Sequence, residues 1–503
     1  MQTLVFSPIK LALLIGWFFL CFWLAQRTQY SLLVPKDKKI SAALMALLLG
    51  PIAFLIFLFI DLMKKSAQSQ SNMIELLKEF IANIFKKEKE EREEFSINLF
   101  DSSGRNLKEI YSHGKSSRDL QVLDLTTEII WKGLELNASD ILIDPKDDSV
   151  STVRLRIDGV LRIIDQLETD TCQAVVNSIK AVANMDIAER RRPQDGAFTA
   201  KTITGNVSFR VASAGALNGE KLSIRVLNQN ANRFRLDNIG ISKKQAIVIQ
   251  NAMKKPSGMI LMCGPTGSGK TTTMYGMLNE IDFNQRNVIT VEDPIEYVLP
   301  QASQIEVNAK ADITFAKSLR SILRQDPDVI CVGEIRDEDT AAIALRASQT
   351  GHLVLATIHS NSNAATIVRL MDLGISPLLI ATGLSTLISQ RLVRKLCENC
   401  KRQANLSQAQ ILSFKKNKVN YLNIYEAVGC EKCHGTGYLG RIAICDILDI
   451  DDNLRTLIAN EKLDIGQLRK NGDEKGKSNL QKQGLKKVVE GITSLDELKR
   501  VLG

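Results

Sequence analysis

Residues 259–280 read MILMCGPTGSGKTTTMYGMLNE. An apolar run comes first, then a glycine-rich loop that closes on Lys270 and Thr271, then a segment with the composition of a helix. A strand, a loop of the form G-x4-GK[ST] and a helix, in this order, make up the phosphate-binding loop of nucleotide-hydrolysing enzymes. The stretch therefore predicts an α/β fold with a nucleotide site, and a glycine-rich turn without a ligand is the alternative.

The residue types in this loop each have a physical task. Glycines let backbone N–H groups curl around phosphates, and the start of the following helix adds positive potential. We expect Lys270 to reach the β and γ phosphates of ATP and the Thr271 hydroxyl to bind Mg²⁺. The predicted nucleotide-binding residues are Gly264, Pro265, Thr266, Gly267, Ser268, Gly269, Lys270, Thr271 and Thr272.

The surrounding sequence repeats the same alternation. Apolar runs at 259–263, 288–291, 329–332 and 353–358 are separated by helical segments, and each run ends in a polar or glycine-rich cluster. This pattern predicts βαβ units and a parallel sheet, whose ligands bind at the carboxyl ends of the strands. We expect a RecA-like P-loop ATPase core over residues 238–395.

Two acidic clusters follow strands of this core. Residues 291–296, VEDPIE, place three carboxylates at a strand end, where one of them can orient the attacking water. Taken alone, a solvated acidic turn explains that cluster equally well. Residues 326–334, DPDVICVGE, deliver Glu334 at a strand end, as the metal-side strand of P-loop enzymes does, with Asp337 as a lesser candidate.

Two of the chain's four histidines, His352 and His359, flank the run 353–358. A single histidine at a strand end is often structural. Because the phosphate loop and the acidic clusters are close by in the predicted sheet, we predict that His359 senses the γ-phosphate.

Nine cysteines are present, and four of them form two C-x2-C pairs separated by 29 residues. These are Cys397 with Cys400 and Cys430 with Cys433. Thiolates at this spacing predict a tetrahedral Zn²⁺ site in a small lobe over residues 396–440, with reactive or buried thiols as the alternative. The other five cysteines lie among apolar residues, which favours a reducing compartment.

The segments on either side of the core have other patterns. Alternating residues at 153–158, a helical segment at 171–185 and strand candidates at 206–211 and 221–226 predict a mixed α+β domain. We place this domain at residues 119–230. A C-terminal helical region is expected at 441–503.

The N-terminus carries two apolar stretches. Residues 40–60 contain no charge over 21 residues and match a bilayer core, whereas residues 11–25 are shorter. Together they predict a membrane hairpin over residues 1–65, followed by a charged juxtamembrane helix and linker at 66–118. A cleaved signal peptide is the alternative for the first stretch, and a buried core helix is the alternative for the second.

Two spans with a cytoplasmic motor would place the loop at 26–39 outside the membrane. That loop is basic, which conflicts with the positive-inside rule. A single span at 40–60 and a re-entrant hairpin are the alternatives.

From about residue 120 to residue 503 the chain resembles the assembly ATPases of type II secretion and type IV pili. The resemblance rests on the phosphate loop and the stretch VEDPIEY. It also rests on SILRQDPDVICVGEIRDEDTAAIALRASQTGHLVLATIHSN, on the cysteine pairs followed by HGTGYLGR, and on the ending GLKKVVEGITSLDELKRVL. The similar pilus-retraction relatives generally lack the tetracysteine lobe.

The resemblance implies a role for each matching residue. Glu296 would activate water, Glu334 would act as the Walker B glutamate near Mg²⁺, and the α+β domain would be PAS-like. Arg210 and Arg225 would approach the nucleotide as arginine fingers, since a guanidinium stays charged beside a γ-phosphate. The expected catalytic set is Glu296, Glu334, Lys270, His359, Arg210 and Arg225; His352, Arg320 and Arg324 are further matches.

The resemblance also implies partners and a location. Such ATPases work as homohexamers on a polytopic inner-membrane platform protein and drive pilin or pseudopilin machinery, with the ATPase domains facing the cytoplasm of a bacterium. ATP, Mg²⁺ and Zn²⁺ are the expected cofactors, and the N-terminus would contact membrane lipid. The net charge of +9 is compatible with an anionic partner but does not demand one, and nucleic acid is not expected.

Other functions remain open at this point. A membrane-anchored DNA translocase and a type IV secretion ATPase are the main alternatives, followed by a P-loop kinase and a catalytically inactive scaffold. The sequence also departs from the family pattern at Leu142, where a histidine is common, and at Ala197, where an arginine is common. Relatives usually begin with a soluble partner-binding domain, so the docking partner is open, as is the choice between pilus and secretion system.

Overall fold

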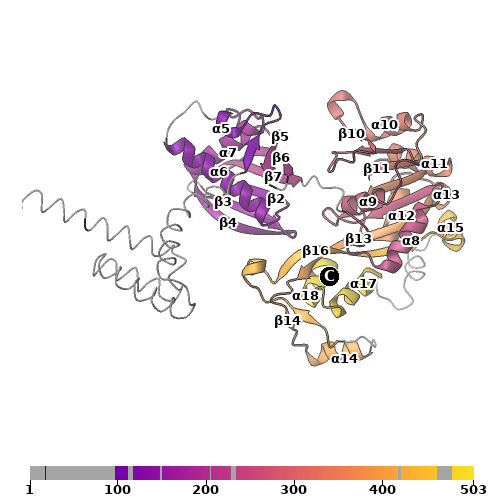
Figure 1. Cartoon of the computed structure of the whole chain (residues 1–503). Coiled ribbons are helices and arrows are strands. Elements are labelled where there is room, and N and C mark those ends of the chain that lie inside the picture. The colour runs from indigo at the N-terminus through magenta and orange to yellow at the C-terminus, as the bar shows by residue number, and fades with distance from the viewer. Residues whose placement is uncertain are drawn as a thin grey trace, which may run out of the picture. The chain divides into compact units, whose positions relative to one another are not determined.

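The computed structural model describes residues 17, 97–110, 117–147, 150–203, 205–227, 234–416, 421–460 and 479–503 (Figure 1). The predicted membrane hairpin over 1–65 and the charged helix after it lie outside the described residues, apart from the single residue Trp17. No helix within the described ranges has the length and apolar character needed to cross a membrane.

In the described residues from 97 onward, the first domain is built on an antiparallel sheet of seven strands in the order β1-β5-β6-β7-β2-β3-β4. Its strands are β1 (Asn98–Phe100), β2 (Asp140–Pro145), β3 (Val150–Ile157), β4 (Val160–Glu168), β5 (Gln194–Thr202), β6 (Gly205–Ala216) and β7 (Gly219–Leu227). The mixed α+β character expected from the alternating pattern is confirmed. β6 and β7 include the candidates at 206–211 and 221–226, and β3 includes the candidate at 153–158 except for its last residue, Asp158.

Three helices accompany this sheet: α5 (Leu107–Ile110), α6 (Ser117–Glu135) and α7 (Thr169–Val182). Helices α6 and α7 bury their apolar sides with alternate strand residues such as Ile141, Ile143 and Val153 in one core cluster. The expected charged helix and linker at 66–118 was wrong in part. Residues 98–100 pair with β5 and residues 107–110 form a helix, two elements too short to show a period in the sequence.

The second part is built on a sheet in the order β10-β9-β11-β12-β8-β13-β16. All neighbouring pairs are parallel except β13 with β16. The strands are β8 (Gly258–Cys263), β9 (Val288–Glu292), β10 (Ser303–Glu306), β11 (Val329–Ile335), β12 (Leu353–Ile358), β13 (Leu384–Leu396) and β16 (Tyr438–Asp449). Each of the four apolar runs predicted as parallel strands is confirmed.

Helices cover both faces of this sheet, so successive strand residues enter two different cores. Met259 and Leu261 pack in one cluster, whereas Ile260 and Met262 pack in the other. Burial on both faces explains why the strands read as continuous apolar runs. The helices are α8 (Lys243–Met253), α9 (Lys270–Leu278), α10 (Phe315–Ile322), α11 (Glu338–Gln349), α12 (Asn363–Asp372), α13 (Pro377–Gly383) and α15 (Asp452–Ala459), with the 3-10 turn η3 (Ala309–Ala311).

The C-terminal end was expected to be a helical region from residue 441, and that expectation was wrong for its first part. Residues 438–449 form β16, which pairs with β13 along most of its length. Helices α17 (Asn479–Val489) and α18 (Leu495–Leu502) do follow. Between β13 and β16 lies a small lobe with β14 (Arg402–Gln403), α14 (Gln408–Lys416), β15 (Tyr425–Glu426) and the 3-10 turn η4 (Glu431–Cys433).

Candidate functional site

The phosphate loop joins β8 to α9 at the carboxyl edge of the parallel sheet. Gly267 and Gly269 have φ values of 75° and 84°, which residues with a side chain rarely adopt. A Cβ atom on Gly264 would lie 2.4 Å from Ser268 Oγ and 2.7 Å from the Gln390 carbonyl oxygen. These three glycines are therefore required by the shape of the loop.

Lys270 begins α9 and folds back over the loop. Its Nζ donates to the carbonyl oxygens of Gly264 at 2.9 Å and Pro265 at 3.2 Å. Burial lowers the pKa of Lys270, and the carboxylates of Glu334 and Glu296 oppose that effect. The predicted cation of the site therefore lies against the loop backbone, with two acidic candidates in its field.

A residue that the sequence analysis did not single out holds the loop from below. Gln390 lies on β13 and is buried. Its Nε2 donates to the Ser268 carbonyl oxygen at 2.8 Å, and its Oε1 accepts from Thr273 Oγ1 at 2.8 Å. Gln390 thus links the loop and the first turn of α9 to the neighbouring strand.

The three carboxylates of the first acidic cluster have three different environments. Glu292 ends β9 and is buried among neutral hydrogen-bond donors. Asp293 pairs with Arg336 at 3.0 Å. Burial raises the pKa of Glu296, while Arg225, Arg210 and a hydrogen bond with the Thr271 side chain act against that rise. Glu296 thus contacts a side chain of the phosphate loop.

Glu334, near the end of β11, is the centre of a second polar group. Its two oxygens face His359 Nε2 at 2.8 Å and Arg336 Nε at 2.9 Å. Thr357 of β12 donates to the Gly333 carbonyl oxygen at 2.6 Å and so fixes the neighbouring strand end. The structure therefore brings together Glu334 and His359, the two residues predicted from separate motifs.

His352 does not belong to this edge of the site, and Asp337 serves there as a helix cap. His352 precedes β12, whereas His359 follows it, so a strand of six residues separates them by about 20 Å. The His352 Nδ1 atom lies 3.1 Å from the Ala347 carbonyl oxygen. Asp337 is the N-cap of α11 and accepts from Thr340 N at 2.8 Å. Both contacts are structural.

Arg210 and Arg225 are direct cross-strand partners on β6 and β7. Arg225 Nε lies 3.2 Å from Asp140 Oδ1, and Arg210 Nη2 lies 3.6 Å from Glu306 Oε1. Ala197 is the cross-strand partner of Arg210 on the other side. The two predicted arginine fingers thus form one basic pair on the sheet of the first domain.

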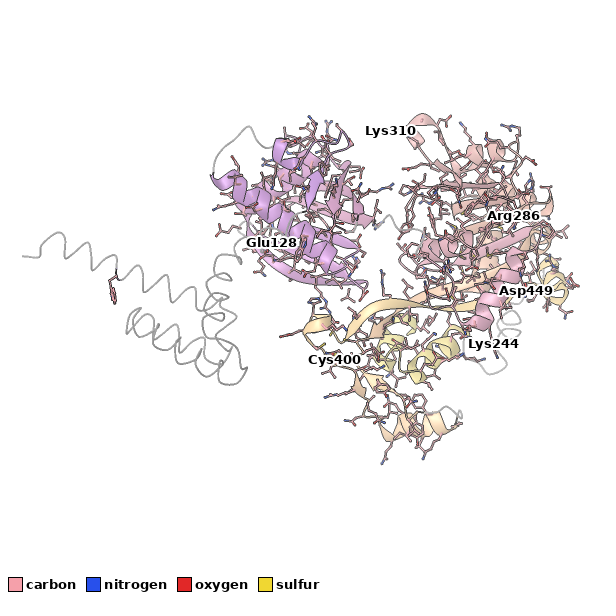
Figure 2. All side chains as sticks on the ribbon, in the orientation of Figure 1. Glu128, Lys244, Arg286, Lys310, Cys400 and Asp449 are labelled. Atoms are coloured by element: carbon pink, nitrogen blue, oxygen red, sulfur yellow. The ribbon has the colours of Figure 1, made fainter. Side chains whose placement is uncertain are left out.

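The four predicted zinc ligands converge in the lobe between β13 and β16, where Figure 2 marks Cys400. All four Sγ atoms lie within 4.8 Å of one another. The distances Cys397–Cys430, Cys400–Cys433 and Cys430–Cys433 are 3.9, 3.8 and 3.7 Å. Four sulfurs about 2.3 Å from one Zn²⁺ would be about 3.8 Å apart, so the donor set fits zinc.

Backbone donors surround these sulfurs. Cys400 Sγ accepts from Gly429 N at 3.3 Å, and Cys433 Sγ accepts from Cys430 N and Gly437 N at 3.2 Å. Although burial acts in the opposite direction, the two N–H groups lower the pKa of Cys433 to about 6. This environment favours the thiolate of Cys433, the form in which cysteine binds metal, whereas burial raises the pKa of Cys400 to about 11.

The C-terminal helices hold the lobe against β13. Glu497 of α18 is buried and accepts from Arg394 of β13 at 2.7 Å and from Arg500 at 2.7 Å. The guanidinium of Arg394 also lies 4.0 Å from the centre of the Tyr438 ring. The C-terminal helix α18 is therefore bonded to β13, the strand that leads to Cys397.

Comparison with known proteins settles the family. Residues 116–500 match the family model described as "Type II/IV secretion system protein". This chain belongs to the type II/IV secretion ATPase family. The type II secretion system protein E of Pseudomonas aeruginosa is 41% identical over 383 residues, 76% of each chain. The type II secretion system ATPase E of Vibrio cholerae is 40% identical over 387 residues, 77% of this chain and 76% of its own length.

Solved structures agree with this assignment of the secretion ATPase. The pilus retraction motor PilT with bound ADP is 27% identical, with a TM-score of 0.50 over 74% of this chain and 95% of its own. The ATPase DotB of Legionella pneumophila is 21% identical, with a TM-score of 0.56 over 74% of this chain and 93% of its own, and supports the fold alone. The enzyme is thus a secretion or pilus ATPase that hydrolyses ATP, as the family resemblance implied.

Proposed function

We propose that this secretion ATPase is a homohexameric motor that powers assembly of a type II secretion pseudopilus or a type IV pilus at the bacterial inner membrane. The observation that carries the proposal is that the carboxylates of Glu334 and Glu296 act on the pKa of Lys270, the lysine of the phosphate loop, in a chain that also carries the tetracysteine lobe. A platform protein and pilin-like subunits are the proposed partners. The N-terminal apolar stretches are the proposed anchor.

Each side chain has a proposed part in hydrolysis. Lys270 and the backbone of residues 264–269 bind the phosphates of ATP. Glu296 orients the attacking water, since it is the acidic group of its cluster that reaches Thr271. His359, paired with Glu334, senses the γ-phosphate.

The metal sites follow from the donor sets. The Thr271 hydroxyl and the Glu334 carboxylate are hard oxygen ligands of the kind that Mg²⁺ prefers. When bound, Mg²⁺ neutralises charge on the phosphate oxygens. Cys397, Cys400, Cys430 and Cys433 hold a structural Zn²⁺ that stabilises the lobe.

Arg210 and Arg225 are proposed to act on the nucleotide of a neighbouring subunit. They lie on a domain separate from the phosphate loop, and cationic fingers stabilise charge that develops on a transferring phosphoryl group. Mixing Lys270→Ala with Arg210→Ala subunits should then restore part of the ATPase activity at hybrid interfaces. No recovery, with hexamers confirmed by mass, would rule out action between subunits.

Two variants test the active site directly. Lys270→Ala should abolish tight ATP binding, because the phosphates lose their main cation. Glu296→Gln should retain ATP affinity and lose hydrolysis by a factor of about 100 or more, because only water activation is removed. Near-normal turnover of Glu296→Gln would reassign the base to Glu334, and stimulation by duplex DNA would favour a translocase instead.

A further inference from the structure

A buried hydrogen-bond network joins the helix after the phosphate loop to the loop that carries Glu296. Its members are Tyr275 on α9, Glu292 at the end of β9 and Gln304 on β10. Tyr275 is 0% exposed and Glu292 is 3% exposed. The motif VEDPIE therefore contains one carboxylate that ATP and water do not reach.

Neutral donors satisfy both oxygens of Glu292. Tyr275 Oη lies 2.6 Å from Glu292 Oε2. Thr290 Oγ1 and Gln304 Nε2 donate to Oε1 at 2.8 and 3.1 Å. A buried carboxylate is tolerated only with such partners, so these contacts fix the side chains around it.

The same side chains also reach the backbone beside Glu296. Tyr275 Oη and Gln304 Nε2 each lie 2.9 Å from the Tyr297 carbonyl oxygen. Gln304 Oε1 accepts from Leu299 N at 2.7 Å, which fixes the orientation of the amide.

With Glu292 ionised, the donors and acceptors of this network match. The Tyr275 hydroxyl proton belongs to the shorter contact, with Glu292. The two Nε2 protons of Gln304 then serve Glu292 and the Tyr297 carbonyl oxygen. Removing any one member leaves a buried polar group without its partner.

Ring packing restrains the same residue from another direction. The Tyr297 ring meets the Tyr275 ring edge-on, with centroids 5.2 Å apart, and meets the Phe234 ring edge-on at 5.0 Å. Both the carbonyl group and the ring of Tyr297 are therefore held. Glu296 is the adjacent residue, so its backbone is held as well.

We propose that Tyr275, Glu292 and Gln304 are positioning residues that keep Glu296 in place against the phosphate loop. The inference rests on the proposed role of Glu296 in orienting water. Tyr275 lies five residues after Lys270 on the same helix. The network therefore fixes the position of Glu296 relative to the helix whose first residue, Lys270, binds the phosphates. A misplacement of about 1 Å can cost about 100-fold in rate, so loss of one contact should be visible.

The test is single-turnover ATP hydrolysis by full-length Tyr275→Phe, which removes one hydroxyl group and keeps the ring packing. We expect hydrolysis to slow by about 10-fold while the Kd for ATP changes by less than about twofold. Gln304→Met, which removes the donor to Tyr297, should show the same split. In a Glu296→Gln background, Tyr275→Phe should cause no further loss, because both changes act through one group.

Tyr438→Phe is the matched control. It also removes one tyrosine hydroxyl, which lies 2.7 Å from Ser494 Oγ in the C-terminal region, and it should hydrolyse ATP within about twofold of the unaltered enzyme. Normal rates for both Tyr275→Phe and Gln304→Met, a raised Kd without a slower step, or an additive loss with Glu296→Gln would each overturn the inference. If Glu296→Gln hydrolyses ATP at a normal rate, Glu296 is not the base. If Glu296→Gln is slow but Tyr275→Phe is normal, only the positioning role is wrong.

Discussion

The two large sheets of this enzyme place their charged groups in different ways. In the parallel sheet, Lys270 begins the helix that follows β8 and Glu334 lies near the end of β11, and the strand between them, β12, is buried on both faces. In the antiparallel sheet, charged residues such as Asp140 and Arg156 lie along the face away from α6 and α7. Asp140 there pairs with Arg156 and Arg225 at 3.2 Å each.

The difference follows from what covers each sheet. Strands buried on both faces can carry charge only where they end, so each chemical group comes from one short stretch of sequence. A sheet covered on one face carries charge at every second residue, and its ion pairs join strands that are far apart in sequence. Motifs reveal the first kind of group, and only the strand register reveals the second.

Substitution of a predicted zinc ligand should have the largest effect. These cysteines belong to the groups that come from short stretches of sequence. Metal analysis should find about one Zn²⁺ per chain, and Cys430→Ser should lose it. Because zinc binding at such sites is worth about 10 kcal/mol or more and is coupled to local folding, the lobe from 397 to 433 should become protease-sensitive. Cys172→Ser, in the other domain, should keep its zinc. A ratio of Zn²⁺ to chain near zero, in unaltered protein purified without chelator, would contradict the zinc site.

Breaking the buried ion pair Lys180–Glu220 should have the next largest effect. This pair joins a helix and a strand that are far apart in the sequence. Lys180 of α7 and Glu220 of β7 are 0% and 1% exposed, and their charged atoms are 2.8 Å apart. Glu220→Ala leaves a buried ammonium group without its counterion and should destabilise this domain by about 3–5 kcal/mol in denaturant titration of the full chain.

The double variant Lys180→Met with Glu220→Leu is the control for this pair. It buries no charge and should recover most of the loss, particularly since Glu220 Oε2 has no hydrogen-bond partner within the part of the chain that the structure describes. A double variant as unstable as the single one would mean that packing, not charge, sets the cost.

These two examples show what the sequence could predict. The run 353–358 became β12 with the same bounds, and the cysteine spacing predicted the tetracysteine cluster, because each signal lies within a short stretch. Gln390 could not be found in this way. It lies in a polar patch within β13, and its contact with Ser268 spans 122 residues. β16 was missed because its pairing with β13 across the lobe, not a local pattern, defines it.

Substitution of Gln390 tests whether a residue that only the pairing of β13 with β8 brings to the phosphate loop affects nucleotide binding. Gln390→Ala removes the donor to Ser268 and the acceptor for Thr273, each buried contact being worth about 1–3 kcal/mol. We expect the Kd for ATP to rise by about 10-fold or more, with a smaller change in the rate of single-turnover hydrolysis. Thr273→Val removes one of the two contacts and should give a smaller rise. Unchanged ATP affinity in Gln390→Ala would show that the loop holds its shape without β13.

Asp140→Asn should have the smallest effect, because it acts on the open sheet face. Arg225 is 64% exposed and Arg156 is 38% exposed, and ion pairs at this exposure contribute about 0–1 kcal/mol each, so the domain should remain folded. What the variant removes is the carboxylate that orients the Arg225 guanidinium. If Arg225 acts on a neighbouring nucleotide, ATP hydrolysis by the oligomer should slow by about two- to fivefold at low salt. The difference in hydrolysis rate between Asp140→Asn and the unaltered enzyme should narrow in about 1 M salt, where screening weakens the Asp140–Arg225 pair in the unaltered enzyme.

Asp144→Asn is a matched control, since Asp144 holds Arg154 at 2.5 Å and Lys221 at 3.3 Å on the same face, and neither cation is assigned to the nucleotide. Equal slowing by both variants would mean that the face acts through its total charge, and an unchanged rate in Asp140→Asn would mean that Arg225 needs no carboxylate to orient it.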